Sequence, residues 1–152
     1  MTSARVGAQP TVIDASLALK WALDDEQHVQ HALALRDDFL GKGRIQVFAP
    51  SLYIYEVING ITSAIRRRRL EHAQGEEVLQ SLLLAEVALR MPSIDGIYGI
   101  ALDYGLSAYD SSYVSLAETL GTDFWTADRQ LYDAVHKKLP WVKWIADYPI
   151  SP

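Results

Sequence analysis

Cysteine is absent from this sequence of 152 residues, which removes several kinds of chemistry at once. A chain without thiols has no disulfide bonds, no thiolate metal site and no cysteine nucleophile. The lack of disulfides fits a reducing cytoplasm, where we expect the protein to act. The four histidines share no spacing typical of metal ligands, so we expect no zinc hydrolase chemistry at His28, His31, His72 and His136.

Long apolar runs are also missing. No stretch of ~18 apolar residues occurs, so we expect no transmembrane helix and no membrane partner. The first ten residues form a short polar segment without the apolar core of a secretory signal, and we expect a flexible extension over residues 1–10. No glycine-rich turn follows the first predicted strand, which argues against dinucleotide binding.

The composition that remains is that of an ordinary globular domain, with 49% hydrophobic and 22% charged residues. The length suits one domain with one core. The net charge of −5 argues mildly against a non-specific nucleic-acid binder, because such proteins are usually basic. An enzyme that gathers carboxylates around cations is an exception, because bound metal offsets part of the negative charge.

Segments with strand character alternate with segments of helical character along the chain. We expect strands at residues 11–13, 45–49, 87–89, 123–126 and 141–145. We expect helices at residues 17–23, 24–40, 51–70, 75–85, 95–104, 107–120 and 128–138. This alternation predicts an α/β domain with three α/β/α layers and a central, mainly parallel sheet.

Two acidic residues lie directly after predicted strands. Asp14 follows the first strand, and Asp128 stands two residues after the strand that ends at Thr126. Ligands of open α/β sheets bind beyond the carboxyl ends of the strands, so both acids belong at the functional edge. Each acid also suits the ordinary role of a helix N-cap or first-turn residue.

The helix predicted at residues 107–120 places Asp110 on an apolar face. That face also carries Tyr113, Val114, Leu116, Ala117 and Leu120. The opposite face carries Ser111, Ser112, Ser115, Glu118 and Thr119. An unpaired carboxylate on an apolar face costs several kcal/mol, so Asp110 needs a partner. That partner is either the start of the helix, through a capping arrangement with Ser107, or a metal ion.

The helix predicted at residues 51–70 places Glu56 on its polar side. The apolar arc consists of Ile54, Val57, Ile58, Ile61 and Ile65. The polar side carries Glu56, Asn59, Ser63, Arg66 and Arg67. Taken alone, Glu56 is expected to be a solvated surface residue. Alternatively, the polar stripe lines a groove with an acid at one end and arginines at the other, which would suit a phosphate backbone. The arginines equally suit a solvated helix end.

Four short segments together resemble PIN domains, and they are most similar to the VapC-type toxins of bacterial toxin–antitoxin pairs. The segments are VIDAS at 12–16, YEVIN at 55–59, LSAYDSSY at 106–113 and WTADR at 125–129. Each motif is weak alone, but the four occur in the family's order, spacing and structural context. The resemblance implies a PIN domain over residues 11–148.

The resemblance also implies a site. The catalytic and metal-binding acids would be Asp14, Glu56, Asp110 and Asp128, with Ser16, Asn59 and Thr126 in support. Mg²⁺ (or Mn²⁺) would bind there, because hard ions prefer carboxylate oxygens. Two carboxylates ~4 Å apart repel by about 4 kcal/mol at an effective dielectric near ~20, and a divalent ion relieves that repulsion. Asp14 and Asp110 would be the main ligands. The polar stripe described above, rather than the resemblance, suggests Arg66 and Arg67 as residues that contact RNA.

The function implied by the resemblance is Mg²⁺-dependent endoribonuclease activity in the toxin of a toxin–antitoxin pair. The implied partners are RNA, a small antitoxin and a second copy of the chain in a homodimer. The main alternative is a PIN-like module that binds RNA or protein without cleavage. A haloacid dehalogenase-like phosphatase is disfavoured, because it needs a second Asp two residues after the first, where this sequence has Ser16.

Overall fold

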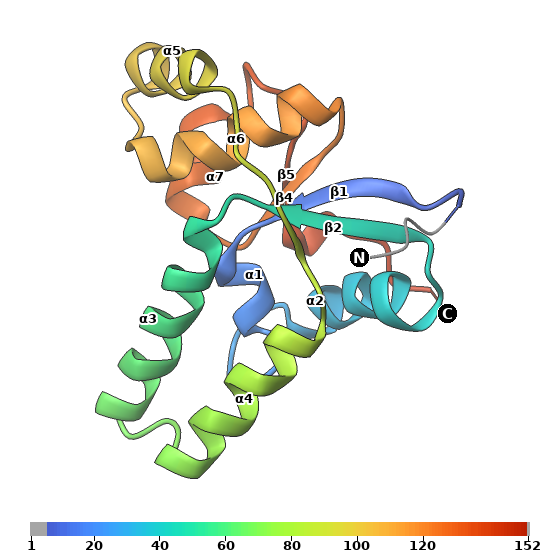
Figure 1. Ribbon diagram of the computed structural model, residues 1–152, viewed down its shortest axis with the longest axis vertical. Coiled ribbons are helices and arrows are strands. Elements are labelled where there is room, and N and C mark those ends of the chain that lie inside the picture. Colours follow the sequence, from blue (N-terminus) through green and yellow to red (C-terminus); the bar gives the residue numbers. More distant parts are fainter. Residues whose placement is uncertain (1–5, 152) are drawn as a thin grey trace.

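The computed structural model describes residues 6–151, and in this range five strands form one sheet (Figure 1). The sheet order is β3-β2-β1-β4-β5, and every pairing is parallel. The strands are β1 (Gln9–Ile13), β2 (Ile45–Ala49), β3 (Ala88–Leu89), β4 (Phe124–Thr126) and β5 (Val142–Trp144). Since β1 is central and β4 lies beside it, the ends of these two strands meet in the middle of the sheet.

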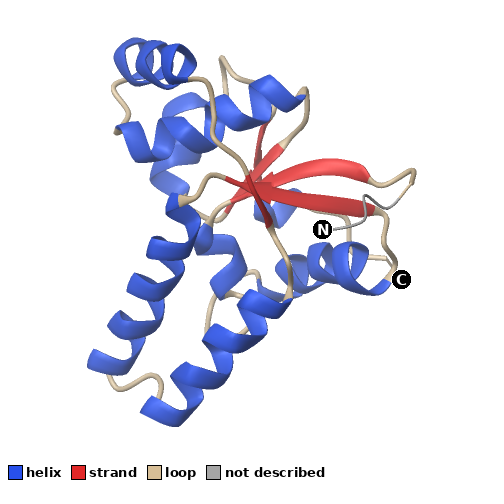
Figure 2. Ribbon diagram, in the orientation of Figure 1, coloured by secondary structure: helices blue, strands red, loops and turns tan. Residues whose placement is uncertain are grey.

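Helices cover both faces of the sheet, which confirms the predicted three-layer α/β/α architecture. They are α1 (Ala15–Leu19), α2 (Val29–Arg36), α3 (Leu52–Arg66), α4 (His72–Leu84), α5 (Ile94–Tyr104), α6 (Ala108–Leu120) and α7 (Arg129–Val135). Figure 2 shows α5, α6 and α7 above the strands and the first four helices below them. The neighbouring helices α3 and α4 extend together away from the sheet.

The strands near the centre of the sheet are buried on both faces. Thr11, Val12 and Ile13 in β1 are all buried, and Val47, Phe48 and Ala49 in β2 are too. Such continuous burial is typical of parallel strands covered by helices on both sides. The core therefore runs through the sheet, and it fixes the carboxyl ends of the strands from which the acidic residues project.

Two helix boundaries differ from the sequence prediction because of residues with left-handed backbone conformation. The helix expected over 24–40 begins at Val29, directly after His28, which has a φ of 59°. It continues through a π-helical turn, η1 (Asp37–Gly41). The helix expected to reach residue 70 ends at Arg66, because Arg68 has a φ of 58°. A positive φ is incompatible with continuing a right-handed helix.

The acids predicted to start the second helix instead make an ion-pair cluster. The Arg69 guanidinium lies 2.7 Å from Asp25 and 2.8 Å from Glu26. Lys20 lies 3.5 Å from Glu26. These contacts connect the end of α3 to the turn before α2, so the acidic run joins two segments that are distant in sequence.

The polar face predicted for α6 is exposed only near the end of the helix, at Glu118 and Thr119. Ser111, Ser112 and Ser115 are all buried, because α6 packs on β1 with one side and on α5 with another. The approach of α5 is close: a Cβ at Gly96 would lie 2.5 Å from the Ser115 Oγ. Small side chains on α6 therefore serve helix packing, and polarity alone was a poor guide to exposure.

The ends of the domain carry two further observations. Residues 1–5 of the predicted extension lie outside the described range, and Gln9 and Pro10 already belong to β1. After β5, a 3₁₀ turn, η2 (Ile145–Asp147), leads to Tyr148, whose hydroxyl donates a hydrogen bond to Asp38 at 2.7 Å. In the described part of the chain, no helix combines the length and apolarity needed to cross a membrane.

Candidate active site at the carboxyl edge of the sheet

Asp14 lies at the junction of β1 and α1, where its carboxylate accepts three hydrogen bonds. The Ser16 hydroxyl donates to Oδ1 at 2.6 Å, and the Leu17 amide donates to the same oxygen at 3.1 Å. The Thr126 hydroxyl, at the end of β4, donates to Oδ2. Asp14 is thus the N-cap of α1, and it is also fixed to the neighbouring strand.

Asp14 is only 6% exposed, and this burial is the largest influence on the pKa of its carboxyl group. Burial raises the pKa of Asp14 from its ordinary value of 3.8 to about 6, although the three hydrogen bonds oppose that rise. The charge of Asp128 raises this pKa further. A carboxylate in this position is therefore costly to ionise unless positive charge comes near.

Asp128 is tied to Asp14 through a shared threonine. Its backbone amide donates to the Thr126 hydroxyl at 2.9 Å, while its own carboxylate accepts from the Leu131 amide at 3.2 Å as N-cap of α7. The Thr126 hydroxyl thus accepts a hydrogen bond from the Asp128 backbone and donates one to the Asp14 side chain. The two acids that follow β1 and β4 are thus held in a fixed relation.

Glu56 is half-buried on α3 rather than fully solvated. The Tyr113 hydroxyl donates to Glu56 Oε1 at 2.6 Å across from α6. The Tyr113 ring is itself buried and stacks on Phe124 at 5.6 Å. Burial raises the pKa of Glu56, and the charges of Asp110 and Asp128 raise it too, against the lowering effect of Tyr113.

Asp110 occupies the first turn of α6 and is half-buried. Its amide donates to the hydroxyl of Ser107, the N-cap of the helix, at 3.1 Å. Burial raises the pKa of the Asp110 carboxyl, and the charge of Asp128 adds to the rise, while Ser107 lowers it. The capping arrangement considered for Asp110 is therefore present, and the carboxylate also lies within the field of another acid.

All four acids thus belong to one electrostatic cluster, since the charge of Asp128 acts on each of the other three. Within residues 6–151, none of the four forms an ion pair with a lysine, arginine or histidine. Carboxylate oxygens without a cationic neighbour fit a hard divalent ion by their chemistry. However, among the described residues, no group of three or more acidic or histidine side chains is arranged closely enough to bind a single metal ion.

A cavity of about 570 Å³ opens between α3 and α6 at two of these acids. Its lining comprises Leu52, Tyr55, Glu56, Asn59, Ser107, Tyr109 and Asp110. Asn59 is therefore placed beside Glu56 in the same cavity. Arg66 and Arg67 are exposed at the far end of α3 and do not line it. Seven positions separate Arg66 from Asn59, or roughly 10 Å along a helix.

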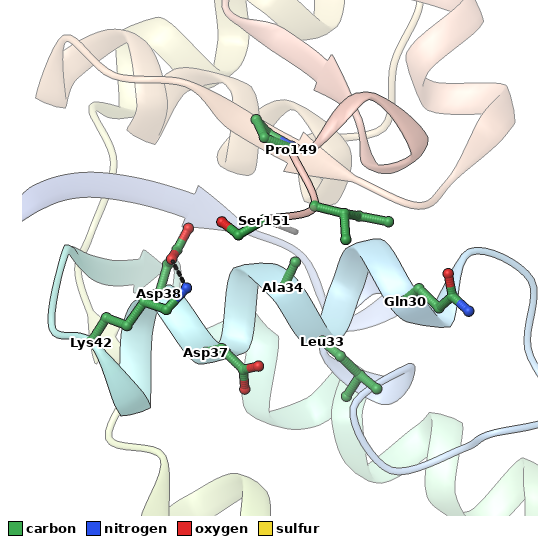
Figure 3. Close-up of a pocket in the computed structure, with 9 residues that line it drawn as sticks. Gln30, Leu33, Ala34, Asp37, Asp38, Lys42, Pro149 and Ser151 are labelled. Carbon is green, nitrogen blue, oxygen red and sulfur yellow. Dashed lines mark ion pairs between the residues drawn. The ribbon is translucent and has the colours of Figure 1, made fainter.

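Another cavity lies away from the acids, between α2, η1 and the C-terminal segment (Figure 3). Pro149 and Ser151 stand over Ala34, and Lys42 pairs with Asp38 at 3.6 Å beside them. None of the four clustered acids lines this cavity. The cavity between α3 and α6 is therefore the one that belongs to the candidate site.

Sequence reasoning missed three tyrosines of the site. Helical spacing places Tyr113 on the apolar face of its helix but does not predict the hydrogen bond from its hydroxyl to Glu56. The spacing of three residues from Asp110 put it on the same side as that acid and was the available signal. Tyr55 and Tyr109 each precede an acid by one residue, and that repeated pairing was a second signal.

The PIN domain family matches residues 11–137, so this chain belongs to the PIN-domain family. PIN nucleases generally depend on divalent metal ions. The match spans four strands of the sheet and all four acids, in agreement with the motifs found in the sequence.

Individual relatives narrow the resemblance to VapC proteins. The chain is 35% identical over 132 residues to "Ribonuclease VapC9" of Mycobacterium tuberculosis, covering 85% of this chain and 94% of that protein. It is 33% identical over 101 residues to "Exonuclease VapC9" of Pyrobaculum aerophilum, covering 66% and 76%. The crystal structure of PAE2754 from Pyrobaculum aerophilum superimposes with a TM-score of 0.65 at 26% identity, covering 91% of this chain and 92% of that one.

Proposed function

We propose that this protein is a divalent-metal-dependent endoribonuclease and the toxin of a toxin–antitoxin pair. The observation that carries the proposal is the electrostatic cluster of four acids, in which Asp128 acts on Asp14, Glu56 and Asp110. Membership of the PIN-domain family and the likeness to VapC ribonucleases support it.

Mg²⁺ or Mn²⁺ would be held mainly by Asp14 and Asp110. Glu56 and Asp128 would complete the site directly or through water. When bound, such a cation neutralises charge on the attacked phosphate and makes water a better nucleophile. Hydrolysis then adds water across a P–O bond of the RNA, and one product receives the proton.

The neighbouring hydroxyls would fix the acids rather than react. Ser16 and Thr126 hold both oxygens of Asp14, so its carboxylate cannot rotate away from the site. Tyr113 holds Glu56 from the opposite layer. Asn59 would contact the substrate beside Glu56, and Arg66 and Arg67 would bind phosphates further along α3.

Cleavage of RNA tests this function directly. The wild-type protein should cut a labelled RNA with Mg²⁺ or Mn²⁺ and lose the activity in EDTA. The Asp14→Asn and Asp110→Asn variants should fold but lose activity by at least ~100-fold, since each removes a proposed main ligand. Asp103→Asn, which alters an exposed acid on α5 outside the cavity, is the matched control and should cleave normally. Full activity in either site variant would refute the assignment.

Two further readouts separate the alternatives. Circular single-stranded RNA has no ends, so its cleavage requires an endonuclease and would distinguish this chain from an exonuclease such as the named Pyrobaculum relative. Added Mn²⁺ should raise the melting temperature of the wild type and raise that of Asp14→Asn less, by ligand linkage. Binding of RNA without any metal-dependent cleavage would instead favour the non-catalytic module.

The toxin role adds a protein partner and a place of action. RNA as substrate puts the activity in the cytoplasm, and a small antitoxin would order on binding and cover the acidic cavity. An apolar cavity of about 170 Å³ between α3 and α4, lined in part by Ile61, Ile65 and Leu79, offers such a partner apolar contacts next to the helix that carries Glu56. Co-expression of the neighbouring short reading frame should relieve growth arrest caused by the protein alone.

A homodimer is the remaining partner proposal. Ile94, Tyr98 and Leu102 recur every four residues on α5 and are 70%, 70% and 68% exposed. An exposed apolar stripe at helical spacing is typical of an interaction surface. We therefore place the contact between copies on this outward face of α5.

A further inference from the structure

We propose that Tyr55 and Tyr109 form a stacking site for bases of the bound RNA, beside Glu56 and Asp110. This inference rests on the proposed function and deepens it. Both tyrosines line the cavity between α3 and α6 that also contains Glu56 and Asp110. Each ring stands one residue before an acid, on opposite walls of the same cavity.

The exposure of the two rings is the first observation that points to a ligand. Tyr55 is 71% exposed and Tyr109 is 68% exposed, although both adjoin half-buried acids. Neither side chain has a hydrogen bond or ring contact with any other described residue. Two large rings thus line the cavity while remaining mostly exposed, whereas Tyr113, which contacts Glu56, is buried and stacked.

The side chains that line the cavity suit the base of a nucleotide better than its phosphate. The tyrosine rings are neutral, so they suit a flat base rather than an anionic phosphate, which belongs beside the cation at the acids. Stacking of bases on aromatic rings is the usual mode of single-strand binding. The Asn59 amide and the Ser107 hydroxyl lie in the same lining and offer hydrogen-bonding groups to base edges. A volume of about 570 Å³ is in the range that holds a nucleotide-sized ligand.

A paired substrate does not fit this arrangement. In an RNA duplex, each base is stacked between its neighbours, and the deep major groove keeps side chains from the base edges. Rings on opposite walls could reach base faces only where the bases are splayed apart. The geometry therefore assigns the base-binding role to the residues that precede the two acids.

Substitution by leucine and by phenylalanine tests the stacking role. Tyr55→Leu and Tyr109→Leu keep an apolar side chain but remove the ring, whereas Tyr55→Phe and Tyr109→Phe keep it. On an unpaired fluorogenic oligonucleotide, we expect KM to rise about 10-fold for each leucine variant with kcat within about 2-fold of the wild type. The phenylalanine variants should match the wild type. Leu84→Ala on α4 is the control, because Leu84 is 80% exposed and lies outside both the cavity lining and the apolar stripe of α5.

A spectroscopic readout reports stacking without cleavage. In the Asp14→Asn background, an oligonucleotide that carries 2-aminopurine should lose fluorescence on binding, because stacking quenches that base. The quench should disappear in the leucine variants and persist in the phenylalanine variants and in Leu84→Ala. A duplex of the same sequence should show neither the quench nor the change in KM.

Several outcomes would overturn the inference while leaving the nuclease intact. One is an unchanged KM in the leucine variants; another is phenylalanine variants as impaired as leucine. A third is loss of dimers by light scattering with unaltered RNA binding, which would assign the tyrosines to a contact between copies. By contrast, a wild type that cleaves no RNA with Mn²⁺ would refute the proposed function itself.

Discussion

At the residue scale, Asp14 shows how burial and polar contacts compete within a single carboxyl group. Three donors satisfy its oxygens, yet burial keeps its pKa near 6. A group with a raised pKa in the folded state keeps its proton there longer than in the unfolded chain. The site therefore resists ionisation on its own, and it favours a bound cation near neutral pH.

This competition predicts the pH dependence of stability without metal. The contribution of Asp14 is fully present below its unfolded pKa of 3.8 and is lost as pH rises through about 6. A difference of roughly two pKa units corresponds to about 3 kcal/mol. We expect the free energy of unfolding, measured with urea in EDTA, to fall between pH 4 and pH 7 by up to about 3 kcal/mol more in the wild type than in Asp14→Asn. Parallel pH profiles for the two proteins would contradict this.

Two buried tyrosines provide a second prediction at this scale. Tyr113→Phe removes the hydroxyl bonded to Glu56 but keeps the ring stacked on Phe124. Since residues that hold a ligand side chain tune metal affinity, Mn²⁺ binding by calorimetry should weaken about 10-fold. Tyr53→Phe is the control, because the buried Tyr53 hydroxyl has no hydrogen-bond partner among the described residues. Equal affinities in the two variants would rule out a role for the Tyr113 hydroxyl.

At the element scale, close helix packing positions the acids. Gly60 lets α3 approach α1, because a Cβ at this position would overlap the side chain of Leu19. The approach places Glu56, one turn earlier on α3, near the helix that Asp14 caps. A glycine inside a helix is costly by itself, so its presence here indicates that the contact outweighs helix propensity.

Two glycine-to-alanine substitutions should therefore have opposite signs. Gly99 in α5 has open space around a Cβ, so Gly99→Ala should raise the free energy of unfolding by up to about 1 kcal/mol. Gly60→Ala gains the same propensity but forces Leu19 to move, and overpacking of this kind costs about 1–3 kcal/mol. We expect a net loss for Gly60→Ala, measured by urea unfolding. An equal increase in the free energy of unfolding in both variants would mean that α1 and α3 can move apart without cost.

The elements also show what the sequence could and could not predict. The alternation of strands and helices and the edge positions of Asp14 and Asp128 followed from local signals. Local signals did not predict which side chains of α6 are exposed, because the burial of its serines depends on the packing of α5 against α6. The half-buried position of Glu56 also depends on a distant contact, because its partner Tyr113 is 57 positions away. Contacts between distant segments set these features, and helical periodicity records only one helix at a time.

At the scale of the whole molecule, the outward face of α5 predicts assembly. Leu102→Glu places a charge in the exposed apolar stripe, so it should convert dimers to monomers at micromolar concentration. Leu84→Glu, at an 80% exposed leucine on α4, is the control and should leave the assembly unchanged. Size-exclusion chromatography with light scattering measures both. A dimer that survives Leu102→Glu would place the contact elsewhere.

The hydroxyl of Thr126 reaches Asp14 across 112 positions of the chain. The site is thus complete only when β4 has paired with β1. A nascent chain in which β4 has not yet emerged from the ribosome lacks this contact. For an enzyme that cuts RNA, assembly of the centre therefore waits until β4 has been synthesised and has joined the sheet.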